Sequence, residues 1–220
     1  MNYLVKYKTS IVLFIFLLAS SFTLSAKAKY YNGYIIMKNG TKIEGQIKSF
    51  QSYDEVVKYR LSADAKDQKV KANEIDILVL KSDEGGNDLV YKHLPKAGTL
   101  FGKQKILESG VLAALFFSND KIEGYLAFYD DGYFTPGLIK NYVNASNVDL
   151  FVRYPDDKYF TWLSSKSTSG PMINGNKTFR KNFERFAESK CPEIVKLIES
   201  KKYKVEDFEA LLKDYTANCN

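Results

Sequence analysis

The sequence predicts an α+β fold, with a mostly antiparallel β region (residues ~30–163) followed by a small C-terminal helical cap. Three observations predict this fold class. Short runs of β-branched and aromatic residues, separated by turn residues, fill the chain up to Leu163. A polar stretch containing Gly170-Pro171 then interrupts the pattern. Beyond it, apolar residues recur with the spacing of amphipathic helices.

The first residues have the three parts of a cleavable secretory signal. Lys6 and Lys8 precede an apolar run over residues 11–18, and Ala26-Lys27-Ala28 supplies the small-residue exit. The run is about half of the ~20 residues that a membrane-spanning helix needs. We therefore expect cleavage after Ala28 and a periplasmic or secreted protein with no membrane span after cleavage. An uncleaved N-terminal anchor is the alternative.

These patterns divide the chain into four segments. They are a signal peptide (1–28), a β-rich domain (29–163), a linker (164–176) and a helical C-terminal region (177–220).

The clearest local structure is a β-hairpin over residues 34–47. Asn39-Gly40 suits a type I′ turn, in which both central residues have positive φ. After the turn, Ile43, Gly45 and Ile47 alternate with polar residues, which is the period of a half-buried strand.

Further strands are predicted wherever β-rich runs lie between turn residues. They cover residues 55–61, 69–81, 89–94, 105–107, 111–117, 124–129, 148–154 and 160–163. Asn119-Asp120, Asp130-Asp131-Gly132 and Pro155-Asp156-Asp157 supply turns between them.

Three helices are predicted at the C-terminal end. Phe179, Phe183 and Phe186 form the apolar stripe of the first. Pro192 suits the first turn of the second, and residues 205–215 form the third.

Cys191 and Cys219 are the only cysteines, and an even pair in an oxidising compartment indicates a disulfide. It would tie the start of the second helix to the end of the third. Two separate thiols are the alternative.

Composition limits the function classes. The 45% apolar content is ample for a packed core. Removing Lys6, Lys8 and Lys27 with the signal lowers the formal charge from +6 to +3. Nucleic-acid binding needs clustered Lys and Arg rather than a small dispersed excess, so we expect no nucleic-acid partner.

No residue cluster has a catalytic, cofactor-binding or metal-binding signature. His93 is the one histidine, and its place between Lys92 and Pro95 predicts a surface or edge position at a strand end. The pairs Asp130-Asp131 and Asp156-Asp157 are explained by turn formation. The oxygen-rich segment 83–88 lacks the spacing of an EF-hand calcium loop. We therefore name no catalytic, cofactor or metal residues.

Several loose motifs resemble uncharacterised exported proteins of Bacteroidetes. The hairpin motif over residues 33–47 is similar to the one that follows the signal in those proteins, and residues 106–112 resemble one of their strands. The tail from Phe179 through Cys191-Pro192 to Cys219 resembles their helical end. Thr41 replaces a more usual Asp, and the Thr-Ala-Asn-Cys ending departs from their pattern. The resemblance implies a Gram-negative envelope or secreted location and implies no activity.

Together these observations predict an exported cell-envelope or secreted protein that acts as a non-catalytic binding or structural module. Its expected partner is an envelope protein or a glycan. The alternative is a hydrolase that acts on envelope glycans or peptides through carboxylates brought together by folding.

Overall fold

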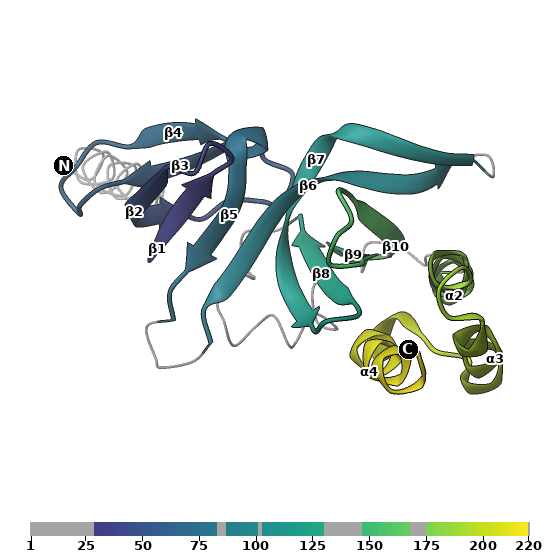
Figure 1. The fold of residues 1–220 in the computed structure, drawn as a ribbon. Helices are drawn as coiled ribbons and strands as arrows, with labels where there is room; N and C mark the ends of the chain where they lie inside the picture. Colours follow the sequence, from purple (N-terminus) through teal and green to yellow (C-terminus); the bar gives the residue numbers. More distant parts are fainter. Residues whose placement is uncertain (1–28, 83–86, 101–102, 130–146, 168–174, 220) are drawn as a thin grey trace, which may run out of the picture.

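The computed structural model describes residues 29–82, 87–100, 103–129, 147–167 and 175–219, and these residues confirm the α+β fold class (Figure 1). Their strands are β1 (Tyr30–Met37), β2 (Lys42–Lys48), β3 (Val56–Arg60), β4 (Gln68–Lys71), β5 (Ile75–Leu80), β6 (Leu89–Leu100), β7 (Lys103–Ser118), β8 (Glu123–Phe128), β9 (Asn147–Arg153) and β10 (Phe160–Ser167). Their helices are η1 (Ala72–Glu74), α2 (Gly175–Ala187), α3 (Pro192–Lys201), η4 (Val205–Asp207) and α4 (Phe208–Asn218).

The strands form one sheet in the order β10-β9-β8-β7-β6-β5-β1-β2-β3-β4. Neighbours in this order are antiparallel. A parallel pairing of Phe160 with Lys96 and of Thr161 with Ala97 also joins β10 to β6. Strands β6 to β10 therefore close into a five-stranded ring, and β1 to β5 extend the sheet away from it (Figure 1).

The predicted hairpin is present as β1 and β2, but the predicted type I′ turn is wrong. Gly40 has a φ of 84°, whereas Asn39 has a negative φ. The Gly40 N–H donates to the Met37 carbonyl at 2.8 Å, and the Met37 N–H donates to the Thr41 carbonyl at 2.8 Å. This is a three-residue loop with one left-handed glycine, the alternative that a glycine after a type I turn permits. The Asn39 side chain instead accepts the Thr41 N–H at 2.9 Å.

Strand boundaries differ from the prediction at three places. β6 continues through Pro95, because the register shifts between Leu94 and Lys96 and the bulge tolerates a residue without an N–H. β7 unites two predicted strands, since Gly110 continues the strand with a φ of 66°. The single strand predicted over residues 69–81 is divided into β4 and β5 by the turn η1.

A large apolar cluster follows one face of the whole sheet. Registered neighbours on this face run across seven strands from β1 to β10, and they are Ile35, Leu78, Tyr91, Ala114, Leu126, Leu150 and Ser164. At the ring, this face is the outer one, and the helices of the cap pack against it. A second cluster on the opposite face therefore fills the interior of the ring, and it comprises Val111, Ala113, Tyr125, Ala127, Phe151 and Phe160.

The helical cap packs closely against the ring. Gly124 in β8 leaves room for the cap, because a Cβ atom there would lie 2.4 Å from Leu212 Cδ1 and 3.2 Å from Phe208 Cζ of α4. The predicted phenylalanine stripe is also present, with Phe179 and Phe183 of α2 fully buried. Since an isolated helix of this length is marginal in water, this packing is what stabilises each helix.

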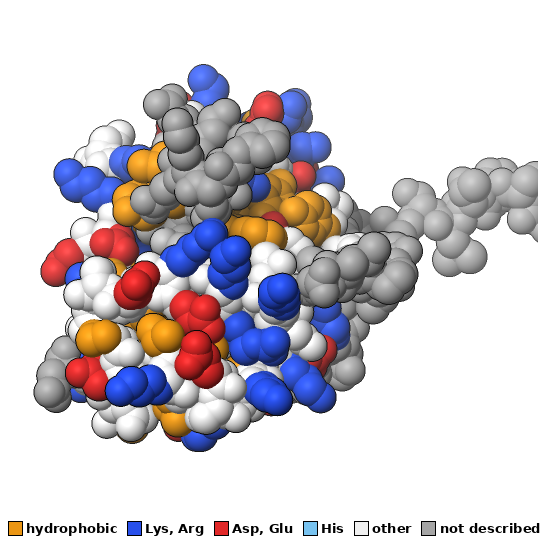
Figure 2. Space-filling model, turned by 90° about the vertical axis from the view of Figure 1, so that its right-hand side faces the viewer, with side chains coloured by type: hydrophobic (Ala, Val, Ile, Leu, Met, Phe, Trp, Pro, Cys, Tyr) orange, Lys and Arg blue, Asp and Glu red, His pale blue; other side chains and the backbone are white. Residues whose placement is uncertain are grey.

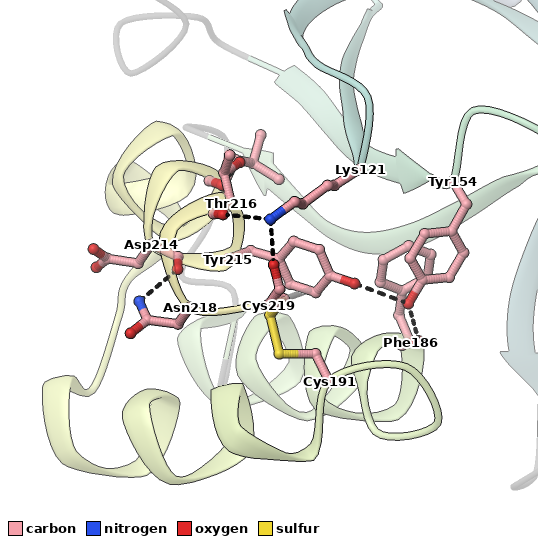
Figure 3. Close-up of a disulfide and its surroundings, with 10 residues drawn as sticks. Lys121, Tyr154, Phe186, Cys191, Asp214, Tyr215, Thr216, Asn218 and Cys219 are labelled. Carbon is pink, nitrogen blue, oxygen red and sulfur yellow. Dashed lines mark hydrogen bonds between the residues drawn. A yellow bond between two sulfur atoms is a disulfide. The ribbon is translucent and has the colours of Figure 1, made fainter.

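The predicted disulfide between Cys191 and Cys219 is present, and it joins the start of α3 to the residue after α4 (Figure 3). Lys121, in the turn between β7 and β8, donates to the carbonyls of Thr216 (3.2 Å) and Cys219. A cation at this position also complements the negative end of the α4 dipole. Both contacts tie the C-terminal end of the chain to the sheet.

The predicted linker (164–176) overlaps two elements of the fold. β10 extends through Ser167, and α2 begins at Gly175, so both elements reach into the range 164–176. The predicted signal peptide (1–28) and the pair Asp130-Asp131 lie outside the described residues. In the part of the chain that is described, no helix combines the length and the apolar character required to cross a membrane.

Candidate functional site: a pocket beside the Ser52 insertion

The candidate site begins where Ser52 inserts between two strands of the ring. Direct pairing of β7 with β8 includes Ala114 with Leu126. Further along, the Ser52 N–H donates to the Phe128 carbonyl at 3.0 Å, and the Ser52 carbonyl accepts the Leu112 N–H at 3.0 Å. The Ser52 hydroxyl accepts the Phe128 N–H at 2.9 Å. One residue from the β2–β3 connection therefore bridges the two strands, which holds that connection against the ring.

Tyr53 anchors the same connection through a buried carboxylate. Its hydroxyl donates to Asp149 Oδ2, which also accepts the Tyr129 hydroxyl at 2.9 Å. Ser165 donates to Asp149 Oδ1. The Tyr53 and Tyr129 rings stack with their centroids 4.6 Å apart, and Lys96 Nζ lies 4.6 Å from the Tyr53 centroid. Three hydroxyl donors thus satisfy a carboxylate that is only 3% exposed.

The hydroxyls at this carboxylate remain protonated over the physiological pH range. Burial, followed by the adjacent Asp149 charge, raises the pKa of Tyr129 to about 12. The same two causes raise the pKa of Tyr53 further. Both side chains therefore act as fixed hydrogen-bond donors, which is a positioning role rather than acid–base chemistry.

A pocket of about 380 Å³ opens beside this anchor. It is lined by residues 52–56 of the anchored connection, 71–73 at the end of β4 and the start of η1, His93 of β6 and 109–111 of β7. The pocket is therefore built between the ring and the outer strands, from segments far apart in the sequence.

His93 is the most unusual side chain in the pocket, and its predicted surface position is wrong. The residue is 3% exposed, on a strand that has neighbours on both sides. The backbone of Gly110 makes room for its ring, since a Cβ there would lie 2.4 Å from His93 Cε1 and 2.7 Å from Nε2. The sequence-based interpretation failed because it took Pro95 as the end of the strand, whereas β6 continues past it.

The imidazole of His93 is neutral at physiological pH and incompletely hydrogen-bonded. Burial, together with the nearby charge of Lys38, lowers the pKa of His93 to about 4. Its Nδ1 atom is buried and has no hydrogen-bond partner among the described residues. A buried polar atom left without a partner costs about 1–3 kcal/mol, so this imidazole lowers the stability of the fold.

The remaining polar groups of the pocket have mixed charge. Lys71 is basic, Asp54 and Glu55 are acidic, and Asn73 and Ser109 are neutral. The Asp54 carboxylate accepts the Gln51 N–H at 2.8 Å and so is used to close its own turn. Among the described residues, no three His, Cys, Asp or Glu side chains are placed to hold a metal ion. The arrangement suits recognition by hydrogen bonds.

No match to this chain is found among protein-family models, curated proteins or solved structures. The site must therefore be interpreted from its own geometry.

Other candidate residues from the sequence lie elsewhere. Asp156 and Asp157 form the predicted turn, in which Asp157 Oδ2 accepts the Tyr154 N–H at 3.1 Å. In the predicted oxygen-rich segment, residues 83–86 are outside the described residues, and Asp88 Oδ1 accepts the Ser82 N–H at 3.1 Å. The disulfide belongs to the helical cap and contributes no residue to the pocket.

Sequence reasoning missed Ser52, Tyr53 and Asp149. Ser52 pairs with Leu112 and Phe128, and Tyr53 pairs with Asp149, so each contact joins residues 60 or more positions apart. No local period marks such contacts. One signal was present: Asp149 is an acidic residue within the otherwise apolar run of β9, and a buried carboxylate needs partners.

Proposed function

We propose that this chain is an exported cell-envelope or secreted protein that acts as a non-catalytic binding module, with the pocket beside Ser52 as its contact site. The observation that carries the proposal is a pocket of about 380 Å³ that the anchored β2–β3 connection, η1, His93 and β7 build together. Pockets of about 300–1,000 Å³ with a few convergent polar groups are typical of ligand-binding sites.

Export is supported by two independent features. The sequence of residues 1–28 is typical of a cleavable signal. The Cys191–Cys219 disulfide is of the kind that persists in oxidising compartments such as the periplasm. The resemblance of the hairpin and tail motifs to exported Bacteroidetes proteins supports the same location. In that setting the partner is an envelope protein or a glycan.

The polar groups of the pocket favour binding over hydrolysis. A carboxylate-dependent hydrolase needs two convergent carboxyl groups, one of them free to give up a proton. At the pocket, Asp54 is held by the Gln51 N–H, and His93 is neutral and buried. These side chains can orient a bound molecule, and the proposal assigns them that role.

Export is tested by intact-mass measurement on the full chain expressed in a Gram-negative host. We expect the envelope fraction to contain a protein that starts at Lys29 and is about 2 Da lighter than the dithiol form. Protein found only in the cytoplasm with residues 1–28 retained would contradict export.

Binding is tested by hydrogen–deuterium exchange of the mature protein with and without a soluble extract of envelope polysaccharide and peptide. We expect slower exchange at residues 52–56, 71–73 and 109–111, which line the pocket. Protection confined to other segments, or no protection at all, would contradict a binding role for the pocket.

A further inference from the structure

We propose that one face of strands β2, β3 and β4 docks on an anionic membrane surface without spanning the membrane. Five basic residues form this basic face, and they are Lys48, Lys58, Arg60, Lys69 and Lys71. The inference goes beyond the proposed function, because Lys71 alone among the five also lines the pocket.

The register of β3 and β4 brings their lysines together. Val57 pairs with Val70, and both belong to the buried apolar cluster. Successive side chains of a strand point to opposite faces, so the next pair, Lys58 with Lys69, lies on the exposed face. Lys71 shares that face with Lys69 and is also exposed. Like charges directly opposite each other destabilise a sheet, so the pairing of Lys58 with Lys69 does not serve the stability of the fold.

Strand β2 extends the same array to a third strand. Ile47 pairs with Tyr59 in the buried cluster, and the same register sets Lys48 level with Lys58. Arg60 lies two residues after Lys58 and so belongs to the same face. Neighbouring strands are about 4.8 Å apart, so the cations form a two-dimensional patch rather than a single row.

The positive charge of the basic face is not neutralised by neighbours. Within the described part of the chain, none of its five side chains forms an ion pair. The nearby Glu44 of β2 is paired with Lys42 at 2.6 Å. Five positive charges exceed the formal charge of +3 that the whole chain keeps after removal of residues 1–28. The excess is therefore concentrated on one face, which the sequence did not indicate.

Protection of the sheet edge explains only part of this array. Lysines on an edge strand discourage pairing with another chain, which accounts for Lys69 and Lys71 on the edge strand β4. Lys48 and Lys58 lie on β2 and β3, which have neighbours on both sides. A flat array of cations is complementary to a surface of anionic headgroups.

The neighbouring side chains favour a membrane over a soluble polyanion. Val56 lies on the same face, where it pairs with Lys71, and is 36% exposed. The Arg60 guanidinium stacks on Tyr30, with its central carbon 3.9 Å from the ring centroid. Tyrosine and aliphatic side chains beside basic residues suit the boundary between headgroups and acyl chains.

The start of the fold also brings this face close to a bilayer. Tyr30 is the first residue of β1, and it pairs with Lys48. Only Lys29 separates Tyr30 from residues 1–28, whose sequence is typical of a secretory signal. A signal lies in the membrane during export, so a chain exported in this way leaves the bilayer beside the basic face.

The experiment uses the mature protein, which contains every described strand and helix, in cosedimentation with lipid vesicles. We expect binding to vesicles of phosphatidylglycerol and phosphatidylcholine in equal parts, and at least tenfold weaker binding to phosphatidylcholine alone. Raising the salt from about 0.1 M to about 1 M should release the protein, since the Debye length falls from about 10 Å to about 3 Å. Equal binding to both vesicles, or binding that salt does not weaken, would overturn the inference.

Two double substitutions form a matched pair. Lys58→Gln with Lys69→Gln should weaken binding at least tenfold, because each basic side chain near an anionic surface contributes about fivefold. Lys181→Gln with Lys196→Gln removes the same charge from exposed positions on α2 and α3, at the other end of the molecule (Figure 1). This control should leave binding unchanged. Equal losses in the two variants would show that net charge, not the basic face, governs binding.

A charge reversal separates docking from folding. Lys58→Glu places a carboxylate opposite Lys69, so the variant should unfold at no lower temperature than the wild type. It should nevertheless bind the anionic vesicles at least tenfold more weakly. A fall in the unfolding temperature would show that Lys58 supports the fold, and vesicle binding equal to that of the wild type would exclude it from docking; either result contradicts the inference.

Competition with soluble polyanions tests the other class of partner. Alginate and a single-stranded oligonucleotide are added at the same concentration of anionic groups as the vesicles. We expect most of the protein to remain on the vesicles. Displacement of more than half of it by either polymer would show that the face prefers a linear polyanion. Failure of vesicle binding leaves the proposed pocket untouched, because hydrogen–deuterium exchange tests the pocket separately.

Discussion

The helical cap and the pocket both lie where a glycine leaves space at the sheet, but that space is filled differently in the two regions. At the cap, Gly124 leaves a depression that Leu212 and Phe208 fill. Lys121 donates to carbonyls at and just after the end of α4. At the pocket, Gly110 leaves space that an imidazole occupies with Nδ1 unpaired. One region is closed by apolar packing and a covalent bond, whereas the other keeps room and an unmet hydrogen bond. The contrast agrees with the proposal that the cap serves stability and that the pocket serves binding.

The charges on the surface of the cap contribute little to its stability. In the view of Figure 2, where the end of the molecule that carries the helices faces the viewer, basic and acidic side chains are interspersed. Two exposed ion pairs belong to these helices, Lys201 with Asp214 and Lys213 with Glu209, each with an N–O distance of 2.7 Å. Surface pairs of this kind contribute little to stability, so the buried face and the disulfide carry most of it.

The largest expected effect comes from removing the disulfide. Replacing both Cys191 and Cys219 by alanine should lower the free energy of unfolding by about 3–4 kcal/mol, because the bridge closes a loop with a sequence separation of 28. The measurement is urea denaturation followed by circular dichroism. The pocket should keep its structure below the lowered transition, so the His93 pKa should be unchanged in the variant.

The wild-type protein in dithiothreitol is the control, and it should lose a similar amount of stability. Equal unfolding midpoints with and without reductant would show that the bridge does not stabilise the cap.

The second effect is a pH dependence of the free energy of unfolding, and it comes from His93 in the pocket. Burial lowers the pKa of His93 from the ordinary 6.5 to about 4 in the folded protein, so between these values the unfolded chain takes up a proton and the folded protein does not. Stability from the neutral imidazole is therefore complete above about pH 6.5 and is lost as the pH falls toward 4. The loss approaches about 3 kcal/mol.

Comparing the wild type with His93→Leu separates the pH-dependent stability of His93 from that of the carboxylates, which titrate in the same pH range. The variant should be at least as stable as the wild type at pH 7.5, since an unpaired polar atom is replaced by an apolar group. Its advantage should grow at pH 4.5, as measured by urea denaturation at both values. An advantage that does not change with pH would contradict a buried, neutral His93.

The smallest of the three effects tests the fit of the cap against the ring. Gly124→Val places carbon atoms where Leu212 and Phe208 now lie, and it should lower stability by about 1–3 kcal/mol through overpacking. Thermal denaturation measures the change. Gly124→Val combined with Leu212→Ala should lose less stability than the sum of the two single substitutions, because the closest contact of the new side chain is with Leu212. Additive effects of the two substitutions would argue against this contact.

Patterns local in sequence predicted most of the fold. The alternation around Ile43 and Ile47 gave β2, and the spacing of Phe179 and Phe183 gave α2. Pro192 marks the first turn of α3 as expected. These elements were predictable because each signal reports the burial of a face with a fixed period.

The candidate site was not predictable, for two physical reasons. First, Pro95 normally ends a strand, but the register shift beside it lets β6 continue and buries His93. Second, Ser52 and Tyr53 lie in a connection with no regular period, and their partners are 60 or more positions away. Only the folded chain brings these residues to the same pocket.

The Ser52 insertion also has a consequence for the order of events during biosynthesis. Ser52 pairs with Leu112 and Phe128, and the ring closes only when β10 reaches β6. The early strands therefore stay without these partners until more than a hundred later residues have been synthesised. Contacts this distant in sequence slow folding, so the unpaired strand edges are exposed to aggregation during the delay.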